Sequence, residues 1–319
     1  MSILVFVEAA DGKIKKTSLE AVSYAAAMNG GSVTAIALGD NIEADELTGL
    51  GTYGAEKVLH AADARFNQGI IQAYASAIAE AYQQTGANTL VLAKSSLGDP
   101  VAARISIKID AALVSNVVAL PDTSNGFSLK RSIYTGKAFS VTSVSKEHKI
   151  IAIKKNAVPL SESGAAAAVE AFAPTFNEAD FGAAITKQEK QTGDILLPEA
   201  DIVVSGGRGL KGPEHWGIIE DLAGALGAAT GCSKPVSDMD WRPHHEHVGQ
   251  TGVKVAPSLY IAVGISGAIQ HLAGVNSSKV LVVINKDADA PFFKAADYGI
   301  VGDAFDIVPK LTEAVKASN

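Results

Sequence analysis

The chain reads Ile202-Val203-Val204-Ser205-Gly206-Gly207-Arg208-Gly209 near the start of its second half. Ile202–Ser205 has the apolar character of a buried strand, and helical spacing begins at Trp216. Glycines between a strand and a helix let the backbone approach an anion, because the first N–H groups of the helix are unpaired. Arg208 adds a guanidinium that suits a phosphate or a carboxylate. The stretch predicts a strand–turn–helix unit, and it leaves a ligand site and a plain tight turn equally open.

Three more strand-like runs follow this unit, at Ser258–Val263, Val280–Ile284 and Tyr298–Val301. All four runs lead into Gly, Ser, Asn or Asp. In an open parallel sheet, ligands bind in the crevice beyond the carboxyl ends of the strands. We therefore expect a site at that edge of the sheet.

The first half of the chain alternates strand-like and helix-like segments, which predicts a mostly parallel sheet covered by helices. Closely spaced β-rich runs over Leu113–Ile153, separated by turn residues, indicate hairpins. A more polar stretch from about residue 156 reads as strand remnants and a linker. We expect two domains: an N-terminal α/β domain with a mostly parallel sheet over residues 1–190, whose linker starts near 156, and a second α/β domain over 191–319. The expected elements of the first half are strands at 2–7, 32–38, 57–60 and 89–93, helices at 18–28 and 69–84, and a helix beginning at Asp99-Pro100.

Composition excludes several classes of protein. The chain of 319 residues carries 27 Lys and Arg against 34 Asp and Glu, a net charge of -7, so we expect neither nucleic-acid binding nor a basic membrane patch. Val255–Ser278 lacks charged residues, but its glycines, Pro257 and His271 favour a buried strand, a turn and a short helix over a membrane span. The N-terminus does not resemble a signal peptide, and the single cysteine fits a reducing compartment, so we expect a cytoplasmic bacterial protein without membrane insertion.

Common catalytic and nucleotide motifs are missing from the sequence. No Asp or Glu lies between Asp221 and Asp238, where a dinucleotide site after the glycine turn at 206–209 would need a ribose-binding acid, and the Walker A pattern does not occur. Both absences disfavour a simple NAD dehydrogenase or a P-loop NTPase. His244, His245 and His247 around Glu246 read better as a solvated loop than as a metal site. Cys232 reads as a packed residue more readily than as a nucleophile. We expect no catalytic residue and no metal ligand.

Two further segments carry polar side chains suited to a ligand. Val248–Gly252 places Gln250 and Thr251 between glycines, where an amide and a hydroxyl suit a planar heterocycle or a simple polar turn. Ser266–His271 enters a helix with a Gln and a His in an otherwise apolar stretch, which leaves a buried core His and a ligand-binding His equally open.

Taken together, these segments resemble the α subunit of electron-transfer flavoprotein. The resemblance covers the last 120 or so residues in order and spacing, whereas the first half matches in length and layout only. It is carried by Val204–Leu210, Val248–Gly252, Leu259–Gly274, Ile284–Asp287 and Tyr298–Val301.

The resemblance implies that the C-terminal domain is a Rossmann- or flavodoxin-like FAD-binding domain. It places Thr251 near flavin N5, His271 near flavin O2, and Asn285 and Asp303 toward the adenosine half. Lys234 stands where the family commonly has Arg, and His247 where Gln is usual. The implied cofactor-binding residues are Arg208, Ser233, Lys234, Val248, Gly249, Gln250, Thr251, Ser266, Gly267, Ala268, Ile269, Gln270, His271, Asn285, Asp303 and Ala304.

The resemblance also implies a carrier and not an enzyme with its own substrate. Such an α subunit pairs with a β subunit that completes the FAD site. It accepts electrons from flavoprotein dehydrogenases, such as acyl-CoA dehydrogenases, and passes them to a membrane quinone oxidoreductase through a flavin semiquinone. An anionic semiquinone needs positive charge or strong donors, which His271, Arg208 and Lys234 supply. A unit charge about 4 Å away contributes roughly 4 kcal/mol at an effective dielectric constant of about 20, before desolvation.

Three alternatives stay open at this point. A bifurcating relative would pair with a subunit that holds a second FAD and oxidises NADH. An ordinary flavin or nicotinamide enzyme would turn over a substrate without a partner. A nucleotide-binding sensor would retain AMP or ATP without flavin colour.

Overall fold

The structure is a computed structural model that describes residues 2–28, 31–136, 138–162, 164–187, 197–198 and 200–318. The chain divides into two compact units, residues 1–134 with 138–188, and residues 135–137 with 189–319. Residues 188–196, where the domain boundary was expected, lie outside the described part, so we describe each unit by itself.

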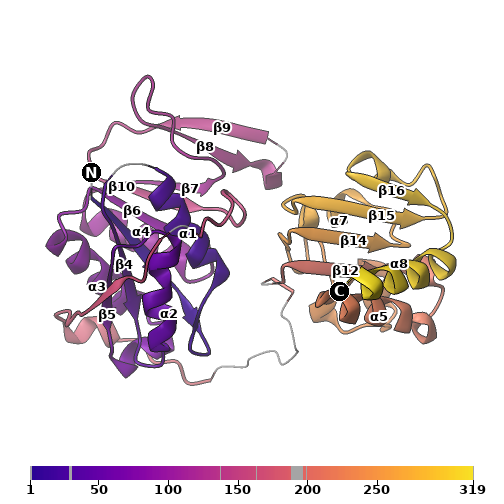
Figure 1. The fold of residues 1–319 in the computed structure, drawn as a ribbon, viewed down its shortest axis with the longest axis horizontal. Coiled ribbons are helices and arrows are strands. Elements are labelled where there is room, and N and C mark those ends of the chain that lie inside the picture. The colour runs from indigo at the N-terminus through magenta and orange to yellow at the C-terminus, as the bar shows by residue number, and fades with distance from the viewer. Residues whose placement is uncertain are drawn as a thin grey trace. The chain divides into compact units, whose positions relative to one another are not determined.

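The first unit is built on a nine-stranded sheet in the order β11-β5-β4-β1-β6-β10-β7-β8-β9 (Figure 1). The strands from β11 to β7 are parallel, and β8 and β9 continue the sheet in antiparallel pairing. This confirms the mostly parallel α/β sheet. The strands are β1 (Ile3–Val7), β4 (Val33–Leu38), β5 (Lys57–Ala61), β6 (Thr89–Ala93), β7 (Ala112–Val117), β8 (Ser128–Ile133), β9 (Ala138–Ser143), β10 (Lys149–Ile153) and β11 (Ala168–Ala171), with a separate small hairpin of β2 (Ala9–Ala10) and β3 (Lys13–Ile14).

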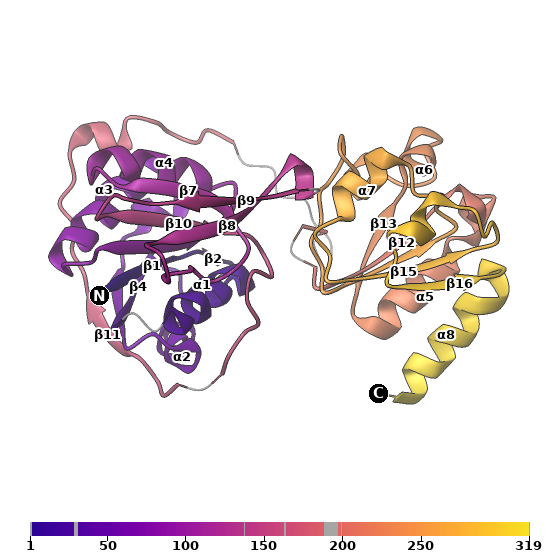
Figure 2. The ribbon, with the colours of Figure 1, turned by 90° about the horizontal axis from the view of Figure 1, so that it is seen from above.

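Helices cover both faces of this sheet. The helices are α1 (Lys16–Ala27), α2 (Ala44–Gly49), α3 (Ile71–Gln84) and α4 (Gly98–Lys108). Figure 2 shows α3 and α4 on one face and α1 and α2 on the other. Alternate residues of β1 supply the two cores, because Leu4 and Phe6 pack with α3 whereas Ile3, Val5 and Val7 pack with α1. Such strands, buried on both faces, explain the continuous apolar runs in the sequence.

Pairing over residues 112–153 differs in part from the expected series of hairpins. β8 and β9 do form an antiparallel hairpin, joined through Ile133↔Ala138. β10, however, returns to lie parallel between β6 and β7. The segment expected to begin the linker also contributes to the sheet, since β11 pairs with β5 at its edge. These pairings join segments far apart in sequence, and no local pattern encodes them.

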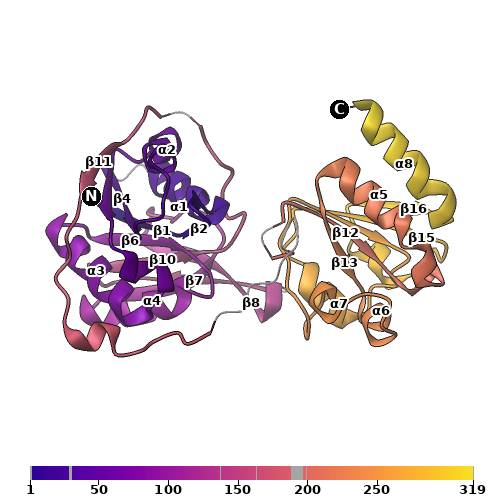
Figure 3. The same ribbon diagram turned by 90° about the horizontal axis from the view of Figure 1, so that it is seen from below.

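The second unit is a five-stranded parallel sheet in the order β13-β12-β14-β15-β16. Figures 2 and 3 show α5 and α8 on one face, and α6 and α7 on the other. Neighbouring residues of β12 again face opposite cores, Val203 toward Tyr260 and Val204 toward Leu222. The strands are β12 (Ile202–Gly206), β13 (Ala229–Cys232), β14 (Leu259–Val263), β15 (Val280–Asn285) and β16 (Tyr298–Val301), and the helices are α5 (Gly217–Leu226), α6 (Lys234–Asp238), α7 (Ile269–Val275) and α8 (Ala304–Ser318).

The charge-free stretch 255–278 forms β14, a glycine turn and the short helix α7, as predicted. Among the described helices, none combines the length and the apolar character that crossing a membrane requires. α8, with Pro309 inside it, was not anticipated from the sequence.

Candidate functional site

The strand order of the second unit defines a topological switch point. If its five strands are numbered in chain order, their order across the sheet is 2-1-3-4-5, which is the flavodoxin-like arrangement. The connections leave β12 and β14 toward opposite sides of the sheet, so a crevice opens between the carboxyl ends of these two strands. The loops after β12 and β14 are the glycine-rich segments that the sequence singled out.

These two loops interlock through their backbones. Gly207 N donates to Val263 O at 2.8 Å, and Gly209 N donates to Gly264 O at 3.0 Å. A Cβ on Gly207 would lie 2.2 Å from the Gly264 carbonyl oxygen. The glycine is required for this close approach of two backbones, which forms the base of the crevice.

A cavity of about 620 Å³ occupies this crevice. Its size lies within the range usual for small-molecule sites. Two bases, Arg208 and Lys234, and two acids, Asp238 and Asp287, make the charged part of the wall. The lining residues are Arg208, Gly209, Ser233, Lys234, Pro235, Asp238, His247, Val248, Thr251, Gly264, Ile265, Ser266, Ala268, Gln270, His271, Asn285 and Asp287.

The loop 248–252 is held in the wall by backbone hydrogen bonds. Val248 N donates to Cys232 O at the end of β13, at 2.9 Å. Gln250 N donates to Gln270 O in α7, at 2.7 Å, and Val253 N closes the loop by donating to His247 O. The amide and hydroxyl segment is thereby joined to both a strand and a helix of the sheet.

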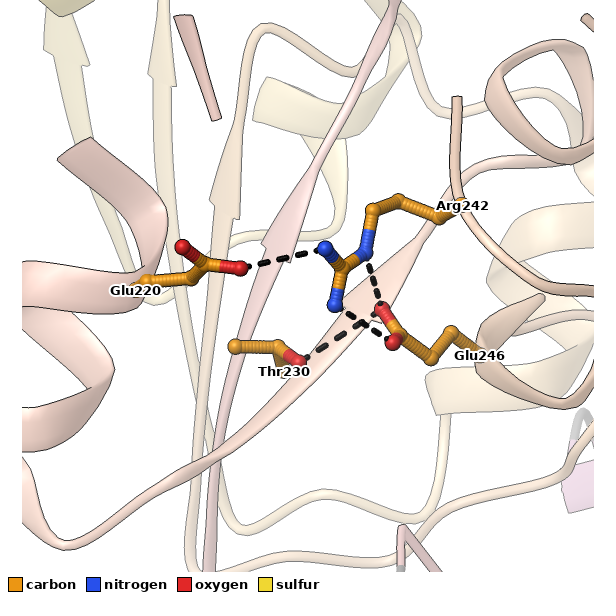
Figure 4. Close-up of polar contacts among 4 residues, drawn as sticks. All are labelled: Glu220, Thr230, Arg242 and Glu246. Atoms are coloured by element: carbon orange, nitrogen blue, oxygen red, sulfur yellow. Dashed lines mark hydrogen bonds and ion pairs between the residues drawn. The ribbon is translucent and has the colours of Figure 1, made fainter. Parts of the chain in front are cut away.

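An ion-pair network fixes the segment that precedes this loop (Figure 4). Arg242 donates to both carboxylate oxygens of Glu246, at 2.9 and 2.7 Å, and to Glu220 of α5 at 3.0 Å. Thr230 Oγ1 lies 3.5 Å from the same Glu246 carboxylate. Glu246 and His247 are buried, so the prediction of a solvated loop is wrong for these two residues, whereas His244 and His245 are exposed. The carboxylate is occupied by Arg242, and the described residues contain no cluster suited to a metal ion.

Two buried histidines line the cavity. His271 is 6% exposed and His247 is 3% exposed, and the Nδ1 atom of each is buried without a hydrogen bond of normal geometry to the described residues. Burial lowers the pKa of His271 to about 4, with His247 acting in the same direction and the Val248 backbone opposing. Burial also lowers the pKa of His247, helped by His244 and opposed by Asp238. His271 is therefore neutral near pH 7 and serves as a hydrogen-bonding group, and the positive charge of the wall comes from Arg208 and Lys234.

Cys232 does not belong to the wall. It is fully buried at the end of β13, and burial raises the pKa of its thiol to about 12. A protonated, inaccessible thiol is a poor nucleophile. The packed interpretation of this residue agrees with the structure.

Comparison with known proteins assigns the family. Residues 3–177 match the electron transfer flavoprotein domain, and residues 196–276 match the electron transfer flavoprotein FAD-binding domain. This chain belongs to the electron transfer flavoprotein alpha subunit family. It is 36% identical to electron transfer flavoprotein subunit alpha of Bacillus subtilis (strain 168), over 99% of this chain and 98% of that one. The counterpart of Pseudomonas aeruginosa is 38% identical, over 99% and 100%, and that of Syntrophomonas wolfei 36%, over 98% of each.

The cofactor of an electron transfer flavoprotein alpha chain is FAD, and the cavity fits this cofactor. The two orphaned imidazole nitrogens are buried polar atoms that a ligand would satisfy. The interlocked glycines leave the crevice free of side chains at its base. Thr251, Ser266 and Gln270 add donors and acceptors along the wall.

The structure brings most of the predicted flavoprotein residues to one wall. From the predicted set, Arg208, Ser233, Lys234, Val248, Thr251, Ser266, Ala268, Gln270, His271 and Asn285 line the cavity. The others lie beside it or farther along the chain: Gly249 and Gln250 in the loop 248–252, Gly267 and Ile269 between lining residues, and Asp303 and Ala304 at the start of α8.

Two of these outlying positions have clear structural roles. Gly267 has a φ of +83°, and a Cβ there would lie 2.5 Å from the Cβ of Phe292. Asp303 accepts a hydrogen bond from Phe305 N at 3.0 Å and pairs with Lys286 at 2.6 Å. Gly267 therefore shapes the turn, and Asp303 caps α8 and binds the β15 loop.

Sequence reasoning missed seven lining residues, of which His247 and Asp238 carry the most chemistry. Gly209, Gly264, Ile265 and Asp287 lay inside the motifs that indicated the family, and Pro235 and Asp238 follow Ser233-Lys234 directly. His247 immediately precedes the loop 248–252, and that position was the available signal. The sequence nevertheless groups His247 with the exposed His244 and His245, because the burial of His247 depends on residues remote in sequence.

Proposed function

We propose that this chain is the FAD-binding subunit of a heterodimeric electron carrier. It pairs with a β subunit, receives electrons from flavoprotein dehydrogenases such as acyl-CoA dehydrogenases, and delivers them to a membrane quinone oxidoreductase. The observation that supports this most strongly is the cavity at the switch point of the FAD-binding domain, lined by hydrogen-bonding groups and two basic residues.

FAD supplies the redox chemistry when bound, because its ring system accepts and returns electrons. The chain itself binds and orients the cofactor. Arg208 and Lys234 place positive charge in the wall, Thr251 offers a hydroxyl for the flavin N5 edge, and His271 offers an imidazole for the O2 edge. Asn285 faces the adenosine half, and we place Asp303 farther along the same half, beyond the cavity described above.

A carrier of this kind needs no residue that removes a substrate proton. The two histidines of the wall have lowered pKa values because of burial, and the thiol of Cys232 has a raised one. These groups suit a fixed electrostatic environment better than general acid–base catalysis.

The test is a spectrum of the chain purified with its β partner, followed by stepwise anaerobic reduction. We expect a flavin spectrum that passes through a red one-electron-reduced form. Two flavins per heterodimer, or direct two-electron reduction by NADH, would indicate the bifurcating alternative. A colourless complex that retains AMP or ATP and does not take up added FAD would overturn the proposal in favour of a nucleotide-binding sensor.

A further inference from the structure

Tyr260 forms a buried pair with His271, a residue that lines the cavity. Tyr260 lies in β14 and is fully buried, and His271 lies in the first turn of α7. The Tyr260 hydroxyl and His271 Nε2 are 2.8 Å apart and share a hydrogen bond. Phe292 packs on both rings, at centroid distances of 6.4 Å to Tyr260 and 5.7 Å to His271. The three rings hold one another, so the imidazole has a defined orientation.

The protons of this pair are constrained by burial. Burial raises the pKa of the Tyr260 phenol far above its usual range, an effect that Ser205 on β12 partly opposes, so the phenol keeps its proton. His271 is neutral near pH 7 because burial lowers its pKa, and it carries one ring proton. The hydroxyl is thus able to donate to Nε2, in which case the ring proton sits on Nδ1.

The surroundings of His271 favour that arrangement. The Val248 backbone interacts with the imidazole so as to favour its protonated form, as a carbonyl beside an N–H does. The reverse arrangement, with Nε2–H donating to the phenol oxygen, would turn the Tyr260 O–H toward Ser205 on β12. It would also leave Nδ1 without a proton beside the Val248 backbone, where an N–H is favoured. Nε2 is occupied by Tyr260, and Nδ1 has no hydrogen bond of normal geometry to the described residues, so Nδ1 is the nitrogen available to a group bound in the cavity.

We propose that Tyr260 is a positioning residue that holds His271 as the neutral tautomer with its proton on Nδ1, so that the ring offers a single N–H donor to an oxygen of bound FAD. The role of this donor rests on the proposed function, whereas the tautomer is a property of the chain alone. His271 then orients the bound cofactor through a directional hydrogen bond, and Arg208 and Lys234 supply the positive charge of the wall.

The test uses the heterodimer, with the full chain selectively labelled with ¹⁵N-histidine, and long-range ¹H–¹⁵N NMR of the imidazoles near pH 7. H271Q assigns the His271 signals among the seven histidines. We expect a protonated Nδ1 and an unprotonated Nε2 in the wild type, and a shift toward the other tautomer in Y260F. The matched control is Y24F, which also removes a buried hydroxyl, the one that donates to Ala119 O at 2.8 Å in the first unit.

A second readout measures the cofactor. We expect Y260F to weaken FAD binding roughly threefold to tenfold, the usual effect of one hydrogen bond, and Y24F to leave it unchanged. A proton on Nε2 in the wild type, or a His271 ring that Y260F does not alter, overturns the inference. The wild-type spectrum decides the tautomer even where Y260F fails to fold. A heterodimer without flavin but with the expected tautomer would reject the proposed function and leave the Tyr260–His271 assignment standing.

Discussion

His271 is a buried neutral imidazole in a wall whose formal positive charge comes from Arg208 and Lys234. A neutral donor orients a ligand, whereas a cation mainly changes the energy of a charged one. Both kinds of group matter for a carrier, because a hydrogen-bond donor and a cation each stabilise electron density added to the flavin. Varying the pH is the best test of His271, because it distinguishes a neutral imidazole from a protonated one.

The first prediction concerns acid stability. The pKa of His271 is about 4 in the folded chain and about 6.5 when unfolded, so as the pH falls below 6.5 the unfolded state takes up a proton first. The free energy of unfolding should therefore decrease as pH falls from 6.5 toward 4, by up to about 3 kcal/mol from this residue. Urea unfolding of the heterodimer across this range should show that H271Q loses this part of the decrease.

H245Q is the control for that experiment, because His245 is exposed on the same unit. Its stability should follow the wild-type pH dependence. If the free energy of unfolding changes equally with pH in wild type and H271Q between pH 6.5 and 4, the lowered pKa of the buried His271 is refuted. Binding of an anionic group beside the ring would raise this pKa and narrow the pH window.

At the scale of elements, the site depends on how two strand-end loops meet. The β12 and β14 loops approach at backbone distance, and the loop 248–252 is tied to β13 and α7. These contacts are made by backbone atoms, which cannot move aside as a side chain can. Single substitutions at the contacts should therefore have large effects.

G207A tests the interlocked loops. The new methyl group would meet the Gly264 carbonyl, and no rotamer relieves the clash. We therefore expect the free energy of unfolding to fall by roughly 3 kcal/mol or more, and bound FAD to be lost. The matched control is G217A, at the first position of α5, where a Cβ meets open space. It should be neutral or stabilising by up to about 1 kcal/mol. Thermal unfolding and flavin absorbance check both, and an FAD-replete G207A with a wild-type midpoint would contradict the prediction.

The Arg242 network tests how the histidine loop is held. R242M leaves the buried Glu246 carboxylate without its cation. We expect the free energy of unfolding to fall by about 2–3 kcal/mol and the flavin spectrum to change. The double variant R242M/E246Q should recover part of this loss, because the stranded charge is gone. K57M breaks the exposed Lys57–Glu170 pair and should change stability by less than about 0.5 kcal/mol. Equal effects of R242M and K57M would show that the network does not support the loop.

At the scale of the whole molecule, the cavity is built wholly from the second unit. Its wall combines residues from the ends of β12, β13, β14 and β15 and from the loop 248–252. A ligand that binds there adds its binding energy to the stability of that unit, by about 2.7 kcal/mol when its concentration is a hundred times the dissociation constant.

Hydrogen exchange of the heterodimer, with and without FAD, checks this assignment. We expect increased protection in peptides that span 205–211, 231–238, 247–252 and 264–271. Peptides from α1, on the sheet of the first unit, are the internal reference. Protection confined to α8 and β16 would place the cofactor outside the cavity.

The sequence by itself determined the class of the fold and indicated where the candidate site lies. Short apolar runs ending in Gly, Ser, Asn or Asp predicted parallel strands with a site at their carboxyl edge, and the structure brings Arg208, Thr251, Ser266 and His271 to one cavity there. These features are local, since strand periodicity, turn glycines and helix starts are written within a few consecutive residues.

Only the tertiary structure decided the rest. The place of β10 between β6 and β7 and the pairing of β11 with β5 join remote segments, and strand order has no local signature. The burial of His247 and the link from Tyr260 to His271 likewise depend on neighbours brought together by the sheet. A histidine's charge follows from how much water and which groups surround it, and these are set by the fold and not by the adjacent residues.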